Sequence, residues 1–190
     1  EKRHLYEDRL DKVIADMTNL VETLLKYARL DRNIAQIEKT GIDLLLLCKN
    51  AITAVALQDD KDARAEITIA STEFFYIIEG DTFYLNLLTE NLLSNAIKYG
   101  AGKVLINIQQ IEQRVLLSIE DNGPGIDEQF RQDIFKPFIR GKNAESNIHQ
   151  PLPKGHGLGM ALVKRIADLH NVTIDITTSE TLGGAKLNLT

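Results

Sequence analysis

The sequence predicts an α/β protein in which a two-layer sandwich of a mixed sheet and helices is preceded by one long amphipathic bundle helix. Apolar residues recur at helical spacing from Leu10 to Ala28. Further along, helix-like stretches alternate with strand-like stretches, which is typical of a layered α/β domain. Four short polar and glycine-containing segments then follow in order between residues 90 and 163.

The composition limits the number of domains and the classes of partner. A chain of 190 residues can bury one core plus a short additional element. Its 27 acidic and 22 basic residues give a net charge of −5, which disfavours nucleic acid as a partner. Cys48 is the only cysteine, so a disulfide within the chain is excluded and a reducing cytosol is expected. Because the sequence starts without Met, we expect a fragment of a longer protein.

The N-terminal segment predicts a helix whose apolar stripe needs a partner. The stripe consists of Val13, Ile14, Met17, Leu20, Val21, Leu24, Leu25 and Ala28. It indicates either a helix shared with a bundle or a helix folded back onto its own domain. We assign residues 1–32 to this helix and residues 34–190 to a second domain, with the break near residues 31–33.

The second domain is expected to alternate between strands and helices, with Asp81 as the N-cap of a central helix. In order, we expect a strand at 34–37, a turn at 40–41, a helix at 42–57, strands at 66–70 and 74–78 joined by a turn, a helix at 81–99, a hairpin of strands at 103–109 and 114–120, a flexible lid at 122–156, a helix at 157–169, and strands at 172–178 and 185–189.

Four segments carry the candidate chemistry: ENLLSNAIKY at 90–99, DNGPGI at 121–126, FKPFIRG at 135–141 and GHGLGMALV at 155–163. In this order they resemble the N, G1, F and G2 boxes of sensor histidine kinase catalytic domains. Those domains share the Bergerat-type ATP-binding fold with gyrase, Hsp90 and MutL ATPases. The resemblance implies that residues 34–190 are the ATP-binding catalytic domain. Residues 1–32 resemble the second helix of the dimerisation bundle, with YARLD at 27–31 as its characteristic ending.

The first of these segments places a polar ridge on a helix. Asn91, Asn95 and Lys98 are spaced by four and three residues and therefore share one helical face. Amide oxygens suit Mg²⁺, and Lys98 supplies a charge for phosphate. The resemblance implies that Asn95 holds Mg²⁺, that Asn91, Lys98 and Tyr99 contact the nucleotide, and that Glu90 is a general base that acts beside Asn95 in catalysis. Alternatively, the two amides only cap or hydrogen-bond nearby loops.

Asp121 ends a predicted strand and begins a turn with Gly123 and Gly125, where small residues allow a flat ligand to approach the backbone. A carboxylate at this point can accept a hydrogen bond from an exocyclic amine. The resemblance implies that Asp121 receives the amino group of adenine, with the two glycines and Ile126 around the base. Taken alone, the string is also typical of an ordinary turn.

The last segment has glycines at the point where the predicted lid becomes a helix. The first N–H groups of a helix have no partner within it, and the helix dipole is positive at this end, so a phosphate can bind there. The predicted nucleotide contacts of this loop are Gly155, His156, Gly157, Leu158, Gly159 and Met160. His156 stands where many relatives have a small hydroxyl residue, and we expect it to pack in the lid or to contact a phosphate. Arg140 on the lid suits the γ-phosphate or the partner bundle, with a solvated position as the alternative.

The resemblance implies an ATP-dependent protein histidine kinase of a two-component signalling system. The γ-phosphoryl group of ATP would pass to a bundle histidine and then to an aspartate in the receiver domain of a response regulator. The expected cofactors and partners are ATP, Mg²⁺, the protein's own dimerisation bundle in a homodimer, and the receiver domain. No histidine of the sequence, His4 included, is followed by the acidic residue and Arg-Thr-Pro turn of the acceptor motif, so the acceptor is expected upstream. The expected location is the cytoplasmic portion of an inner-membrane sensor.

Two other functions fit the same motifs. One is an ATPase of the same superfamily that drives a conformational cycle, which the amphipathic N-terminal helix disfavours. The other is a nucleotide-binding dimerisation module without turnover.

Overall fold

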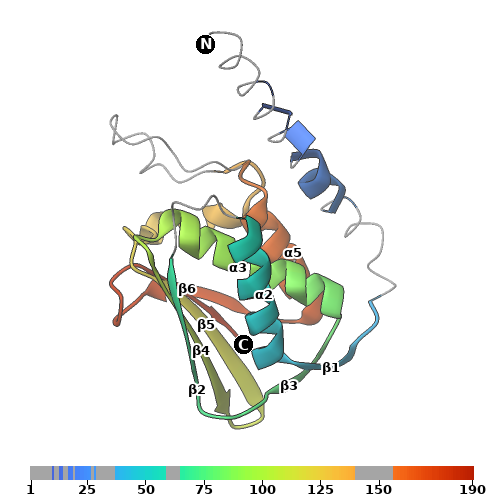
Figure 1. Cartoon of the computed structure of the whole chain (residues 1–190), viewed down its shortest axis with the longest axis vertical. Helices are drawn as coiled ribbons and strands as arrows, with labels where there is room; N and C mark the ends of the chain where they lie inside the picture. The colour runs from blue at the N-terminus through green and yellow to red at the C-terminus, as the bar shows by residue number, and fades with distance from the viewer. Residues whose placement is uncertain are drawn as a thin grey trace. The chain divides into compact units, whose positions relative to one another are not determined.

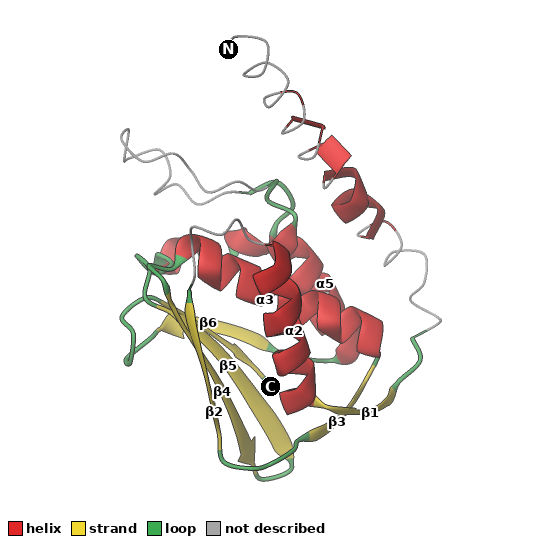
Figure 2. Ribbon diagram, viewed as in Figure 1, coloured by secondary structure: helices red, strands yellow, loops and turns green. Residues whose placement is uncertain are grey.

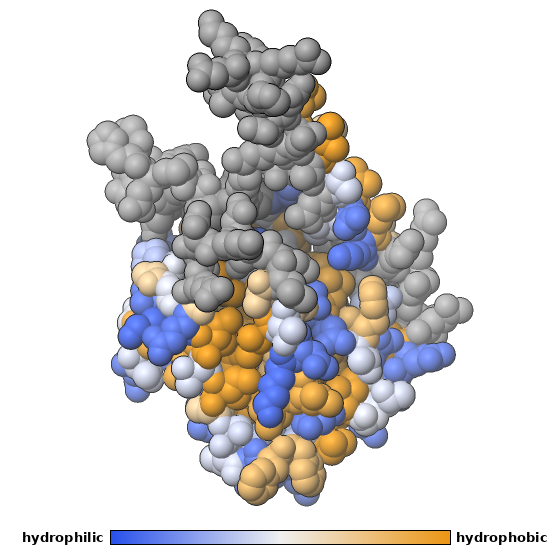
Figure 3. All heavy atoms as spheres, in the orientation of Figure 1, coloured by the Kyte–Doolittle hydropathy of each residue, from blue (hydrophilic) through white to orange (hydrophobic). Residues whose placement is uncertain are grey.

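The computed structural model describes residues 10, 13–14, 17–18, 20–26, 28, 37–58, 65–139 and 156–190. Internal contacts divide the chain into a first unit, Glu1–Gln36, and a second unit, Ile37–Thr190. The described residues of the first unit between Leu10 and Ala28 are helical. Several apolar side chains along this helix are exposed (Figure 3). Met17, for example, keeps 62% of its surface in solvent.

The second unit contains the sheet and the helices that cover it (Figure 1). Its elements are β1 (Thr40–Asp43), α2 (Leu44–Gln58), β2 (Glu66–Ser71), β3 (Ile77–Gly80), α3 (Thr82–Tyr99), β4 (Lys103–Ile111), β5 (Arg114–Asp121), the short 3₁₀ turns η1 (Glu128–Phe130) and η2 (Asp133–Phe135), α5 (Gly159–His170), β6 (Ile174–Thr178) and β7 (Ala185–Leu189).

Five strands form one mixed sheet in the order β2-β4-β5-β7-β6, and β1 pairs with β3 in a separate two-stranded sheet. The β2–β4 pair is parallel and the other pairs are antiparallel. The helices α2, α3 and α5 form a layer on one face of the larger sheet (Figure 2). Leu93, Ile106 and Ile166 are fully buried between the layers. The predicted two-layer α/β sandwich is confirmed.

The predicted start of this domain was wrong in detail. Residues 34–36 of the predicted strand lie outside the described residues, and Ile37 is not in a strand. Thr40 and Gly41, predicted as a turn, belong to β1 because they pair with Gly80 and Glu79 of β3. Ladder hydrogen bonds from a strand distant in sequence therefore override the local turn preference.

The two strands predicted at 66–70 and 74–78 form, but they do not pair with each other. β2 joins the larger sheet beside β4, whereas β3 begins only at Ile77 and joins β1. The chain between them is held by the buried hydroxyl of Tyr76. This hydroxyl donates to Ile108 O at 2.9 Å and accepts from the backbone N–H groups of Thr72 at 2.9 Å and Glu73 at 3.0 Å. One side chain thus holds the segment that connects β2 of the larger sheet to β3 of the smaller sheet.

The helix α3 begins where the sequence predicts. The Asp81 carboxylate accepts from the N–H groups of Phe83 at 3.0 Å and Tyr84 at 3.2 Å, which caps the first turn. The backbone N–H of Asp81 donates to His170 Nε2 at 3.0 Å, so the proton of this imidazole is on Nδ1, 2.8 Å from Ile166 O. The last residue of α5 is therefore tied to the start of α3.

The only cysteine, Cys48, is fully buried in α2. Burial, followed by the nearby negative charge of Asp43, raises the pKa of its thiol to about 12. The thiol stays protonated at neutral pH and packs as a small apolar group.

Replacing Tyr76 with Phe tests the role of its hydroxyl. The Tyr76→Phe variant leaves the carbonyl of buried Ile108 and two N–H groups without this partner, so the free energy of unfolding should fall by about 1–3 kcal/mol. Urea denaturation followed by circular dichroism measures the change. Tyr84→Phe is the matched control, since no hydrogen bond of the Tyr84 hydroxyl is found among the described residues. Equal effects of the two substitutions would contradict the assignment.

Candidate functional site

The site begins where α3 meets the first residue of α5. Asn91 and Asn95 are half-buried on α3, and Gly159 starts α5. A Cβ atom on Gly159 would lie 2.9 Å from Asn91 Oδ1 and 3.9 Å from Asn95 Nδ2. A side chain at this position would therefore have to displace the Asn91 amide from its present place. Two of the sequence-predicted segments are thus brought together.

The amide of Asn91 has a defined orientation. Its Nδ2 donates to Leu87 O, one turn earlier in α3, at 2.7 Å. The remaining oxygen, Oδ1, is directed to the start of α5. At that start, no side chain of the described residues caps the helix at Leu158. An amide oxygen and the N–H groups of a helix N-terminus therefore face one place, an arrangement that accommodates an anion with an associated cation.

The second part of the site is the carboxylate of Asp121 at the end of β5. The residue is 6% exposed. Its Oδ1 accepts from Gly123 N at 2.8 Å and from Ala185 N at 3.2 Å. The two hydrogen bonds hold one oxygen in place, whereas Oδ2 has no partner among the described residues. A buried carboxylate with one fixed and one available oxygen can recognise a donor such as an exocyclic amine.

Burial raises the pKa of the Asp121 carboxyl above its ordinary value, because desolvation disfavours the charged form. The hydrogen bonds from Gly123 and Ala185 act in the opposite direction and lower it. They therefore offset part of the effect of burial.

The backbone packs closely on both sides of Asp121. A Cβ atom on Gly123 would overlap the carbonyl oxygen of Tyr99, and one on Gly184 would overlap both Asp121 O and Oδ1. Asn122 ties this turn to the segment after α3, since its Oδ1 accepts from Ala101 N at 3.0 Å and Lys103 N at 2.8 Å. The glycines at 123 and 184 are therefore steric requirements of the site.

Sequence reasoning missed the turn between β6 and β7, which supplies the second wall around Asp121. Gly184 N donates to Asp121 O at 3.1 Å, in addition to the bond from Ala185. The dipeptide Gly183-Gly184 between two predicted strands was the only available signal, and it indicates a turn without indicating what the turn contacts.

The other predicted residues fall into three described groups and two residues that are not described. Glu90 is half-buried on α3, whereas Lys98 and Tyr99 at its end are exposed. Gly125, with a φ of 76°, and Ile126 follow the Asp121 turn. His156, Gly157, Leu158, Gly159 and Met160 lead into α5, with Leu158 buried. Arg140 and Gly155 lie outside the described residues.

The described ends of the predicted lid segment meet at Gly157. Its carbonyl accepts from Phe138 N at 2.9 Å, and its φ of 71° lies in the left-handed region. A Cβ atom on Gly157 would be 2.9 Å from both Ile139 O and Phe138 C. Residues 138–139 thus pack directly against the loop that precedes α5.

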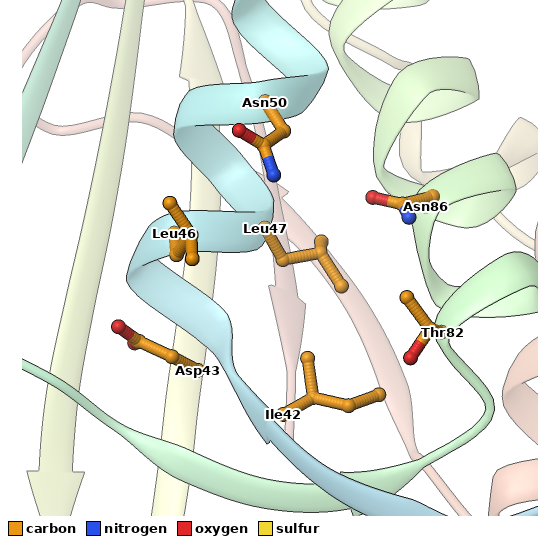
Figure 4. A pocket seen from close by; sticks show the side chains of 7 residues that line it. All are labelled: Ile42, Asp43, Leu46, Leu47, Asn50, Thr82 and Asn86. Atoms are coloured by element: carbon orange, nitrogen blue, oxygen red, sulfur yellow. The ribbon is translucent and has the colours of Figure 1, made fainter.

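Two hollows of the surface lie away from these residues. One, of about 120 Å³, lies between α2 and α3, where Asn50 and Asn86 face each other across it (Figure 4). The other, of about 670 Å³, lies at the end of the sandwich near His170 and Thr190. Neither is lined by a sequence-predicted site residue. We therefore assign the site from the converging polar groups.

The described residues contain no cluster of three or more His, Cys, Asp or Glu side chains that could hold a metal ion. No described helix combines the length and the apolar character needed to cross a membrane.

Residues 80–190 match the family model described as histidine kinase-, DNA gyrase B- and HSP90-like ATPase. The chain belongs to this family. The matched segment contains the Asn91, Asp121 and Gly159 elements of the site, and the family predicted from the motifs is confirmed.

Curated relatives in this family are named as sensor kinases. The chain is 32% identical over 180 residues to the sensor protein RstB of Escherichia coli K12, which covers 94% of this chain and 40% of RstB. It is 39% identical over 115 residues to the sensor-type histidine kinase PrrB of Mycobacterium tuberculosis, which covers 60% of this chain and 24% of PrrB. The chain therefore spans less than half the length of these two relatives.

Solved structures show the same fold. The full-length structure of ShkA, described as in complex with AMPPNP, has a TM-score of 0.74 at 25% identity and covers 91% of this chain and 35% of ShkA. The ATP-binding domain of PrrB from Mycobacterium tuberculosis has a TM-score of 0.61 at 28% identity, with 79% of this chain and 93% of that domain covered. Sequence and fold together identify the histidine kinase type of ATP-binding domain.

The contact between α5 and α3 predicts the effect of a single methyl group. Gly159→Ala forces Asn91 Oδ1 to move and should weaken ATP binding at least about tenfold, which isothermal titration calorimetry measures. Gly41→Ala is the matched control, because its Cβ would lie 3.5 Å from Ile77 Cγ2, an ordinary contact. Unchanged affinity in Gly159→Ala would show that the ligand does not use this junction.

The raised pKa of Asp121 predicts acid sensitivity of binding. If the ionised form accepts the amine of a bound adenine, affinity is present above this pKa and is lost as the pH falls through it. The loss should begin at a higher pH than for an ordinary aspartate, whose pKa is about 3.9. Titrations with ATP at several pH values measure the change. Asp121→Asn should bind ATP weakly and should not show this loss of affinity at low pH. The same pH profile in both proteins would exclude Asp121 as the source of the loss.

Proposed function

We propose that this chain is the ATP-binding catalytic part of a sensor histidine kinase in a two-component system. The observation that supports this most is the pairing of a fixed acceptor with a polar helix junction in one domain. Asp121 presents one free carboxylate oxygen, and the amide oxygen of Asn91 faces the uncapped start of α5. Relatives that share this domain are named sensor kinases.

The base of ATP would be selected at Asp121. Its Oδ2 accepts one hydrogen of the adenine amino group, while Oδ1 remains bound to Gly123 N and Ala185 N. Gly125 and Ile126 continue the wall beside the base. A guanine presents a carbonyl oxygen at the same position and would face a carboxylate without a donor, which disfavours GTP.

The phosphates would lie at the start of α5. The loop of Gly157, Leu158, Gly159 and Met160 offers backbone N–H groups, and the helix dipole favours negative charge there. Lys98 adds a positive charge from the exposed end of α3. Arg140, Gly155 and His156 are proposed as further contacts from the predicted lid.

Mg²⁺ fits the amide groups on α3. Asn95 is the proposed protein ligand, and the neighbouring oxygen of Asn91 is free of intrahelical bonding because its Nδ2 already donates to Leu87. Few protein oxygens are needed, since Mg²⁺ keeps several waters and binds substrate phosphates. When bound, the ion neutralises phosphate charge.

The reaction would be an in-line phosphoryl transfer. A nitrogen of a bundle histidine outside this chain forms a bond to the γ-phosphorus, and the bond to the β–γ bridging oxygen breaks to release ADP. Glu90, next to Asn91 on α3, would accept the proton of the imidazole as the general base. Because little covalent chemistry falls to the protein, positioning by α3, α5 and Asp121 provides most of the catalysis.

The partners follow from this role. The exposed apolar stripe of the N-terminal helix would pack in the dimerisation bundle of a homodimer. From the bundle histidine, the phosphoryl group would pass to an aspartate of a receiver domain. We place this chain in the cytoplasmic portion of an inner-membrane sensor, with no role in nucleic acid binding.

The amide ligand predicts a metal-specific defect. Asn95→Ala should abolish the enhancement of ATP affinity by Mg²⁺, while binding without metal changes little. Calorimetric titrations with ATP in the presence of Mg²⁺ or of a chelator measure the difference. Asn86→Ala, an amide of the same helix in the hollow of Figure 4, is the control and should behave like the wild type. An unchanged Mg²⁺ dependence in Asn95→Ala would remove this assignment.

The transferase function itself can be tested with a separately produced acceptor bundle. The chain is mixed with the bundle and with ATP labelled at the γ-phosphate, and the bundle is analysed for acid-labile label. We expect label on the bundle histidine, and much less label with Asp121→Asn because this variant binds ATP weakly. Release of inorganic phosphate without labelled bundle would indicate the ATPase alternative, and ATP binding without either product would indicate a binding module.

A further inference from the structure

A cluster around the buried carboxylate of Glu120 lies next to the candidate adenine site and takes no direct part in it. Glu120 precedes Asp121 on β5 and is only 2% exposed. Its Oε1 is 3.0 Å from Lys186 Nζ, and its Oε2 accepts from Ser179 Oγ at 2.6 Å. Lys186 is the direct cross-strand neighbour of Glu120 in the β5–β7 pair. The carboxylate therefore has a partner for each oxygen.

Ser179 connects this cluster to the turn between β6 and β7. Its Oγ accepts from Leu182 N at 2.8 Å while it donates to Glu120. Its backbone N–H donates to Gly184 O at 2.8 Å, and its carbonyl accepts from Gly183 N at 2.9 Å. One buried serine thus closes the turn at both of its ends and ties it to β5.

The β6–β7 turn also holds Asp121 in place. Gly184 N donates to Asp121 O at 3.1 Å, and Ala185 N, at the start of β7, donates to Asp121 Oδ1 at 3.2 Å. The turn packs closely on Asp121, because a Cβ atom on Gly184 would overlap both of these oxygens. A shift of the turn would consequently move the carboxylate or remove one of its two donors.

The cost of burying Glu120 supports a role beyond stability. Removing the Glu120 carboxylate from water costs several kcal/mol, whereas the side chain of Lys186 is still 29% exposed. The partners of this buried carboxylate hold a tight turn against the candidate binding group and so give that group a defined position. Glu120 is also the direct neighbour in sequence of Asp121, the proposed acceptor of the adenine amino group.

We propose that Glu120, Ser179 and Lys186 are positioning residues that hold the β6–β7 turn against Asp121 and thereby set the preference of the site for the amino group of adenine. They touch Asp121 only through the turn and the chain, so none of them contacts the nucleotide. This inference rests on the proposed nucleotide-binding function.

The test compares ATP with purine riboside triphosphate, which carries hydrogen in place of the 6-amino group. Calorimetric dissociation constants with Mg²⁺ are measured for the wild type, Ser179→Ala and Glu120→Gln. We expect the wild type to prefer ATP by about tenfold or more. In both variants the affinity for ATP should fall toward that for the analogue, while the affinity for the analogue stays nearly constant. Ser179→Thr, which retains the hydroxyl group, should restore the preference.

Ser118→Ala is the matched control. Ser118 is also a buried serine of β5, and its Oγ donates to Asn188 Oδ1 at 2.9 Å, away from the turn. Its loss should leave the ratio of the two affinities unchanged. If Ser179→Ala and Glu120→Gln keep the wild-type ratio, or lose affinity equally for both nucleotides, the positioning role is wrong. If one of the two does not fold, the ratio in the other decides.

The outcome separates this inference from the proposed function. A wild type that binds neither nucleotide contradicts the nucleotide site itself. A wild type that binds both with the same affinity leaves nucleotide binding intact and overturns the positioning role, because there is then no amine preference to set.

Discussion

The fixed oxygen of the Asp121 carboxylate determines how the rest of the site is built. Two backbone N–H groups, from Gly123 and Ala185, come from segments more than sixty residues apart and meet on this atom. Their meeting requires β5 and β7 to be neighbours in the sheet and requires residues without side chains at 123 and 184. The position of this buried acceptor therefore depends on the pairing of β5 with β7 and on the two glycines.

The helix α3 contacts both ends of α5, whose start forms the other half of the site. Its capped start is tied through Asp81 N to His170 at the end of α5, and its middle meets the beginning of α5 through Asn91 and Gly159. The two helices are thus fixed to each other at both ends of α5. A ligand at the α5 N-terminus and a base at Asp121 would be held by elements that share one core, so their separation is set by packing rather than by the loop between them.

The sequence predicted most of the fold because its strongest signals are local. The Asp81 cap, the length of α3 and the strand that ends at Asp121 all follow from neighbouring residues. The motifs also brought Asn91 and Gly159 into one site, since both belong to segments with a known order. What failed depends on distant partners: Thr40 and Gly41 join a strand only because β3 lies beside them. The role of Ala185 likewise follows from a backbone N–H, which every residue type except proline offers.

The location of the nucleotide can be tested residue by residue. In a nuclear magnetic resonance titration of the ¹⁵N-labelled chain with ATP and Mg²⁺, each backbone amide reports on its own surroundings. Our account predicts the largest changes at Gly123, Ala185 and Gly159, with little change at Asn50 and Asn86 in the hollow between α2 and α3. Large changes around that hollow, with none at Gly123 and Ala185, would contradict the account.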